Sequence, residues 1–234
     1  MSAILIFLAV LAVIISWWMA QQRLMSKPWL EVGHQGDRPQ REGSSIPTAK
    51  IGLGVFLAVV GALFALLISA YFMRMGLNDW WAVPIPGSLW FNTGVLVASS
   101  IALEWTKAKA QNGNLEAVKA GLGLSFVTAV AFLSGQIFAW RQLAAAGYVL
   151  ADNPANSFFY LITGMHGLHI LGGLVALLRT SLKVFDGAPI KTIRLGVELC
   201  AMYWHFMLLV WLILFALFAG WANDFVEICR QLLT

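Results

Sequence analysis

Six long stretches of this sequence contain no Asp, Glu, Lys or Arg, and this pattern limits the possible folds more than any other feature. They cover residues 1–22, 51–73, 80–103, 120–140, 153–178 and 199–223. Each reaches the length of about 20 residues that a helix needs to cross a hydrocarbon core. Only 11% of the chain is charged, whereas a typical soluble domain is about 25% charged. Lipid offers the backbone no hydrogen-bond partners, so we predict an all-α integral membrane bundle with six transmembrane helices.

Two of the six stretches need a closer reading. The third begins with Trp80, Trp81, Pro84 and Pro86, which are typical of an interfacial loop, so its helix should begin near Ser88.

The first stretch could instead be a signal peptide. No Lys or Arg precedes its apolar run, and it ends in Trp17 and Trp18, which suit a membrane interface. We therefore predict a retained helix.

The basic residues predict the orientation of the chain. Twelve of the 15 Lys and Arg residues lie in three segments, 20–50, 105–119 and 179–194, which alternate with the predicted spans. Positive charge collects on the cytoplasmic side of membrane proteins, so both termini should face outward. The basic residues sit in short loops between apolar runs, which argues against nucleic-acid binding despite the net charge of +4.

The predicted organisation has four parts. Residues 1–22 form an N-terminal transmembrane helix, 23–50 a cytoplasmic linker, 51–222 a five-helix bundle, and 223–234 an outer C-terminal tail. The linker prediction rests on the Gly, Pro, Ser and charged residues that dominate its second half.

Polar residues inside the predicted spans are candidates for function, because polar groups are costly in lipid. His166 and His169 lie on one side of the fifth helix, with Gly164 and Gly167 on roughly the other. We interpret the histidines as packing residues at a helix–helix or lipid-headgroup contact. Ligation of a metal or haem is the alternative, although no third ligand is evident.

The other polar candidates also favour structural roles. Glu198 and His205 share a face of the sixth helix but lie ~10 Å apart, so each needs a partner elsewhere. A proton relay through them is the alternative. Gln136, and Asn92 with its neighbour Thr93, are predicted to form interhelical hydrogen bonds.

The 11 tryptophans fit an aromatic belt at the two membrane surfaces, with three exceptions. Trp90, Trp204 and Trp211 lie deeper in the predicted spans, and we interpret them as packing residues. The sequence has no P-loop, dinucleotide fingerprint or H-E-x-x-H motif. Composition and spacing alone therefore predict a helical membrane bundle that binds a partner or lipid.

Several local sequence runs are more specific. T-G-M-H-G-L-H at 163–169 is similar to the T-G-F-H-G-L-H signature of haem–copper oxidase subunit III. Y-W-H-F at 203–206, with Trp211 further on, resembles the Y-W-H-F-V-D-x-x-W signature in the last helix of that family. The run at 89–99 is similar to L-N-T-x-x-L-L-A-S, and Gln136 and Glu198 also match family positions. The matches occur in the family's order over about 50–221, so the chain resembles this family along most of its length.

The resemblance implies a non-catalytic accessory subunit of cytochrome c oxidase, the enzyme that couples oxygen reduction to proton pumping. It implies contact with catalytic subunit I and other oxidase subunits, phospholipid binding, and a bacterial inner-membrane location. Haem and copper would belong to the partner subunits, so this chain should hold no cofactor, metal or catalytic residue of its own. The residues expected at lipid or subunit contacts are His166, His169, Glu198, Trp204, His205, Asn92 and Gln136.

The sequence departs from the family pattern at two places. Leu208 replaces the Asp of Y-W-H-F-V-D, and residues 59–61 are apolar where many members carry a buried Glu. These losses favour a structural role over a proton-handling one.

Three alternatives stay open from the sequence alone. They are subunit III of a quinol oxidase, an accessory subunit of a nitric oxide reductase, and a stand-alone metal-binding protein or transporter that uses His166, His169 and His205. The sequence does not identify the electron donor or the lipid species.

Overall fold

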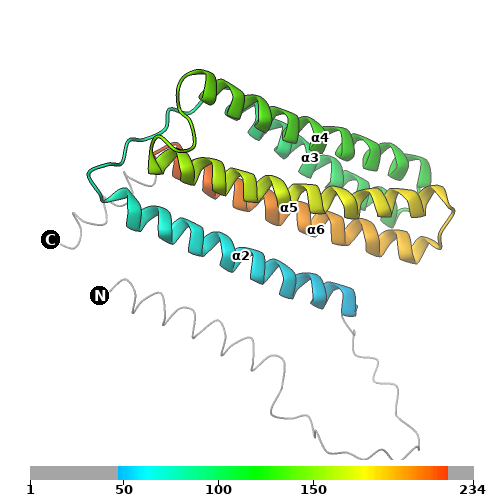
Figure 1. Cartoon of the computed structure of the whole chain (residues 1–234). Helices are drawn as coiled ribbons and strands as arrows, with labels where there is room; N and C mark the ends of the chain where they lie inside the picture. The colour runs from blue at the N-terminus through cyan, green and yellow to red at the C-terminus, as the bar shows by residue number, and fades with distance from the viewer. Residues whose placement is uncertain (1–46, 221–234) are drawn as a thin grey trace, which may run out of the picture. The chain divides into compact units, whose positions relative to one another are not determined.

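The computed structural model describes residues 47–220, and the predicted first helix (1–22) and outer tail (223–234) lie outside this range. The described part consists of helices joined by loops (Figure 1). The helices are α2 (Thr48–Met75), α3 (Ser88–Gln111), α4 (Leu115–Ala145), α5 (Pro154–Phe185) and α6 (Ile190–Phe218). The all-α prediction is confirmed for these residues.

Successive helices run in opposite directions, so the connections gather at two ends of the bundle (Figure 1). The long-loop end holds residues 76–87 and 146–153, and the short-loop end holds residues 112–114 and 186–189. Helices α3, α4, α5 and α6 pack closely on one another, whereas α2 packs mainly against α5 and α6.

Residues at the helix ends explain where the helices begin and stop. The side chain of Asn114 accepts a hydrogen bond from the backbone N–H of Ala117, and Asn153 caps α5 in the same way, with proline next in the chain. Gly113 and Gly187 follow α3 and α5 with positive φ angles of 75° and 71°. Glycine reaches this backbone region without steric cost, so the chain can reverse there.

Four helices in the described range, α2, α4, α5 and α6, are long and apolar enough to cross a membrane. The chain is therefore a multi-pass membrane protein. Helix α3 begins at Ser88, as the prolines before it predicted. Its mean hydropathy is lower because it carries many polar residues, of which Asn92, Ser99, Ser100 and Thr106 are buried in the bundle. That α3 and residues 1–22 also cross the membrane stays a prediction.

Several helices extend past the charge-free stretches that predicted them. Helix α4 begins before Lys119, and α5 continues through Arg179 and Lys183. We had predicted all three basic residues to lie in loops, and that prediction was wrong. Long basic side chains can reach the membrane surface from within a helix, so the first charged residue after an apolar stretch does not mark the end of the helix.

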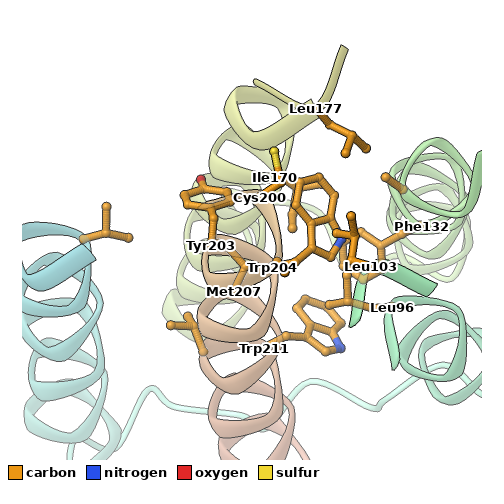
Figure 2. Close-up of a cluster of buried hydrophobic side chains, with 14 of the residues drawn as sticks. Leu96, Leu103, Phe132, Ile170, Leu177, Cys200, Tyr203, Trp204, Met207 and Trp211 are labelled. Atoms are coloured by element: carbon orange, nitrogen blue, oxygen red, sulfur yellow. The ribbon is translucent and has the colours of Figure 1, made fainter. Parts of the chain in front are cut away.

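The core lies where α6 meets α3, α4 and α5. Trp204 and Trp211 extend from α6 toward α3 and α4, while Tyr203 projects on the side that faces α2 (Figure 2). Trp204 is 0% exposed and Trp211 is 1% exposed, which confirms both as packing residues. Trp90 is 57% exposed, so it does not lie deep in the bundle as predicted, although its ring packs edge-on against that of Phe215 with the centroids 4.6 Å apart. It lies near the start of α3, where hydropathy alone does not tell the inner face from the outer one.

Candidate functional site

A layer of polar side chains links α3 to α4 and α6. The amide of Asn92 donates to Gln136 Oε1 on α4 over 3.5 Å. The indole N–H of Trp211 on α6 donates to Thr93 Oγ1 over 2.9 Å. The interhelical hydrogen bonds predicted for these three polar residues are thus confirmed. Because lipid offers no competing partners, such bonds fix the register of the helices.

His166 packs against Trp211 of this layer and is 0% exposed. Its Nε2 is 3.1 Å from the carbonyl oxygen of Met207 on α6, so this nitrogen carries the proton and donates it. The ring centroid lies 5.0 Å from that of Trp211 and 5.7 Å from that of Phe132. Nδ1 has no hydrogen-bond partner among the described residues. His166 therefore joins α5 to α6 through one nitrogen.

His169 is oriented differently, although it lies one turn away. Its Nδ1 donates to the carbonyl oxygen of Met165 over 2.8 Å, which leaves Nε2 as an acceptor. The ring lies 5.6 Å from that of Phe64 on α2, and the hydroxyl of Tyr203 donates to the backbone carbonyl of His169. The two histidines therefore have different surroundings, since His166 is enclosed in the core and His169 lines a groove.

This groove runs between α2, α5 and α6 and has a volume of about 520 Å³. Its middle is lined by apolar and aromatic side chains, including Leu53, Phe56 and Tyr203. Toward the short-loop end it is bordered by Arg179 and Lys183, which are exposed and have no ion-pair partner among residues 47–220. A groove with an apolar middle and two cationic side chains at one end can bind an amphiphile that carries a negative charge.

Glu198 and His205 have separate partners, as their spacing predicted. Glu198 accepts a hydrogen bond from Lys50 Nζ over 2.5 Å, and this ion pair joins the first turn of α2 to α6. His205 Nδ1 donates to the carbonyl oxygen of Ala201, and its Nε2 lies 3.9 Å from a carboxylate oxygen of Glu104 on α3.

The histidines are not arranged as a ligand set. No three His, Cys, Asp or Glu side chains in the described range come together in a way that could hold a metal ion. His166, His169 and His205 each have one ring nitrogen bonded to a backbone carbonyl.

Sequence reasoning missed several residues that build these features. Lys50 and Glu198 are 148 positions apart, and no local signal connects them. Met207 contributes only its carbonyl, which any residue could supply. Arg179 and Lys183 could have been found, because residues four apart share one face of a helix.

The sequence profile described as cytochrome c oxidase subunit III matches residues 3–223 of this chain. The chain belongs to the cytochrome c oxidase subunit III family. The resemblance noted from the local runs is thereby confirmed. Membership identifies an oxidase subunit rather than the stand-alone metal-binding protein or transporter that the sequence had left as an alternative.

Individual relatives agree with the family assignment. The chain is 29% identical over 175 residues to cytochrome c oxidase subunit 3 of Synechocystis sp., covering 71% of this chain and 72% of the relative. It is 34% identical over 143 residues to a probable cytochrome c oxidase subunit 3 of Mycobacterium bovis, covering 59% of this chain and 65% of the relative. A probable cytochrome c oxidase subunit 3 of Nocardia farcinica is 31% identical over 176 residues, covering 71% of this chain and 84% of the relative.

Proposed function

We propose that this chain is a non-catalytic accessory subunit of a cytochrome c oxidase, in which oxygen reduction is coupled to proton pumping. It binds phospholipid in the groove between α2, α5 and α6 and stabilises catalytic subunit I. The haem and copper belong to the partner subunits. Family membership supports the complex, and the groove with its two cations supports the lipid.

The groove is the observation that carries this proposal. Acyl chains fit its apolar middle beside Phe56 and Tyr203, and a phosphate fits near Arg179 and Lys183. His169 also lines the groove, and its Nε2 is left to accept a hydrogen bond from a headgroup or glycerol hydroxyl. Membrane phospholipid is the amphiphile with this combination of groups.

The role of the other predicted contact residues follows from their position. His205 and Glu104 are exposed together on α6 and α3, and Trp90 is exposed at the other end of α3. We assign this surface to the contact with other oxidase subunits. Trp204, Asn92, Gln136 and His166 shape the bundle from inside, while Glu198 holds α2 against α6.

The proposed topology has six transmembrane helices with both termini outside. At the short-loop end lie Lys50, Lys107, Lys109, Lys119, Arg179, Lys183, Lys191 and Arg194, and at the long-loop end only Arg74 and Arg141 among the described basic residues. This asymmetry supports a cytoplasmic short-loop end in a bacterial inner membrane. We assign residues 1–22 to a sixth span, the residues from 23 to the start of α2 at Thr48 to the cytoplasmic linker, and 223–234 to the outer side.

The complex provides the first test. Affinity purification of the chain from its native membrane should recover a haem–copper catalytic subunit, and a preparation without one would reject the proposal. Oxygen uptake with reduced cytochrome c or with quinol then separates the two oxidase types. Nitric oxide consumption by the complex would favour the reductase alternative instead.

The lipid role has its own test in the same complex. The double variant Arg179→Gln with Lys183→Gln should retain fewer phospholipids after purification and should lose activity sooner during turnover. Lys191→Gln is the matched control, because Lys191 is a basic residue at the same end that does not line the groove. Equal lipid content and lifetime in the double variant and the control would contradict phospholipid binding in the groove.

A further inference from the structure

We propose a second lipid site, at the long-loop end of the bundle, where Arg141 binds the phosphate of an anionic phospholipid and the acyl chains lie in two grooves on either side of Trp140. This site is separate from the groove described above. It lies at the opposite end of α4 and α5.

The two grooves share a common ridge. One has a volume of about 490 Å³ and is lined by Leu161 and Ser157 together with the ridge, and the other has about 340 Å³. The ridge that borders both consists of Trp140, Leu150 and Tyr160. The smaller groove also includes Ile137, Arg141, Ala144 and Val149. A lipid with two acyl chains could place one chain on each side of such a ridge.

Hydrogen bonds hold the ridge in place without any ligand. The indole N–H of Trp140 donates to Thr163 Oγ1 over 3.1 Å. The hydroxyl of Tyr160 lies 2.9 Å from the carbonyl oxygen of Tyr148 and 3.4 Å from that of Trp140. Ser157 Oγ donates to the carbonyl of Leu150 over 2.5 Å. The polar groups of the lining residues are thus engaged, and the grooves offer mainly carbon surface to an occupant.

Arg141 is the remaining polar group at this site, and it is exposed. It makes no hydrogen bond or ion pair within residues 47–220, not even with Asp152 of the adjacent loop. The other basic residue that the described range 47–220 places at this end, Arg74, is already paired with Asp79. A guanidinium at a membrane surface favours a phosphate, which it can bind through two parallel hydrogen bonds.

The depth of these residues matches a lipid. Arg141 is one turn from the end of α4, next to loop 146–153, where headgroups lie. Ile137 lies one turn further into the bundle on α4, about 6 Å deeper, and Leu161 lies about two turns from the start of α5. A phosphate at Arg141 therefore directs the acyl chains along the grooves toward the hydrocarbon core.

The test uses the purified complex in nanodiscs that contain phosphatidylglycerol with a photoreactive group on its acyl chain. Cross-links should appear on peptides covering residues 137–161. Arg141→Gln should reduce them by about tenfold, as expected for the loss of one charge-assisted contact. Arg141→Lys should restore part of the labelling. Zwitterionic phosphatidylcholine with the same photoreactive group should label these peptides less.

Arg179→Gln is the reciprocal control. It should reduce labelling of the α5 residues that line the first groove and leave residues 137–161 unchanged, so failure at one site can be told from failure at the other. Equal labelling of 137–161 in Arg141→Gln and the parent chain would overturn the proposal. Absence of labelling at 137–161 in the complex, while the first groove is still labelled, would show that protein covers these grooves, and competition by inorganic phosphate would show a free anion site. Both results would overturn the lipid assignment.

Discussion

The indole nitrogen of Trp204 donates a hydrogen bond to Ser99 Oγ over 3.0 Å, although the two residues are 105 positions apart. Both side chains are 0% exposed. Ser99 Oγ in turn donates to the carbonyl oxygen of Ser125 over 3.3 Å. One serine therefore connects α6, α3 and α4, at a depth where no water competes for these bonds.

Ser99→Ala should destabilise the chain because it leaves the indole N–H of Trp204 buried without a partner. The expected loss is about 0.5–2 kcal/mol in the free energy of unfolding. Ser100→Ala is the matched control, since Ser100 Oγ is buried and has no partner among the described residues. Its removal should be neutral or stabilising. Denaturant unfolding in mild detergent measures both, and equal effects of the two substitutions would contradict this role of Ser99.

Close helix contact gives a second prediction, at adjacent glycines of α5. A Cβ atom on Gly173 would lie 2.5 Å from the ring of Tyr203 and 2.8 Å from that of Trp204, whereas a Cβ on Gly172 would meet nothing within 4 Å. Gly173→Ala should therefore separate α5 from α6 and cost about 1–3 kcal/mol. Gly172→Ala should be neutral or slightly stabilising, because alanine favours the helix. Thermal unfolding of both variants checks the difference, and an unaffected Gly173→Ala would show that the aromatic rings move aside.

The sequence predicted the helices well because the length of a membrane-spanning helix is set by the thickness of the bilayer. It predicted the start of α3 at Ser88 from the prolines before it. The predicted end of α5, before Arg179, was too early, because a charged side chain near a helix end can extend to the membrane surface and the helix continues past it. The charge-free stretches therefore mark the parts of the helices that lie in the hydrocarbon core, and the helices extend beyond these stretches.

The candidate site was harder to predict from the sequence than the helices, because its contacts depend on tertiary packing. The type and spacing of Asn92 and Gln136 were enough to predict interhelical bonds, but not their partners. The different environments of His166 and His169 depend on how α5 is rotated between α2 and α6, which tertiary packing decides. The exposure of Trp90 depends on packing in the same way.

The loop at residues 76–87 gives a prediction about pH. Arg74 donates hydrogen bonds to both carboxylate oxygens of Asp79, and these bonds lower the pKa of Asp79 below its ordinary value of 3.8. Because the pKa of Asp79 is lower in the folded state than in the unfolded chain, the ion pair stabilises the fold fully above pH 3.8. This stability is lost as the pH falls through the lowered pKa, where the carboxylate becomes protonated. The protection factors of amide hydrogens near Asp79, which correct for the pH dependence of intrinsic exchange, should thus be unchanged down to pH 5 and should fall below about pH 4.

Asp79→Asn tests this origin of the pH dependence. The variant should show fast exchange in the loop at every pH, with no transition in the acidic range. Asp152→Asn provides the control, because Asp152 makes no ion pair with the described residues. If the acidic transition survives in Asp79→Asn, another group controls the loop.

The attachment of α2 gives the last prediction. This helix buries only three side chains, Val60, Phe64 and Tyr71, and none of them lies in its first turn, where the ion pair between Lys50 and Glu198 joins α2 to α6. Both partners are partly exposed, and such pairs contribute about 1 kcal/mol or less and weaken in salt. Glu198→Gln should therefore increase amide exchange over the first turns of α2.

High salt should have the same effect on the parent chain and little further effect on Glu198→Gln. The exchanged pair, Lys50→Glu with Glu198→Lys, should restore much of the protection, since attraction depends on opposite charge rather than on which residue carries it. Glu116→Gln serves as the control, because Glu116 pairs with Lys119 inside α4 and does not contact α2. If Glu198→Gln exchanges as slowly as the parent chain over the first turns of α2, packing against α5 and α6 holds α2 by itself.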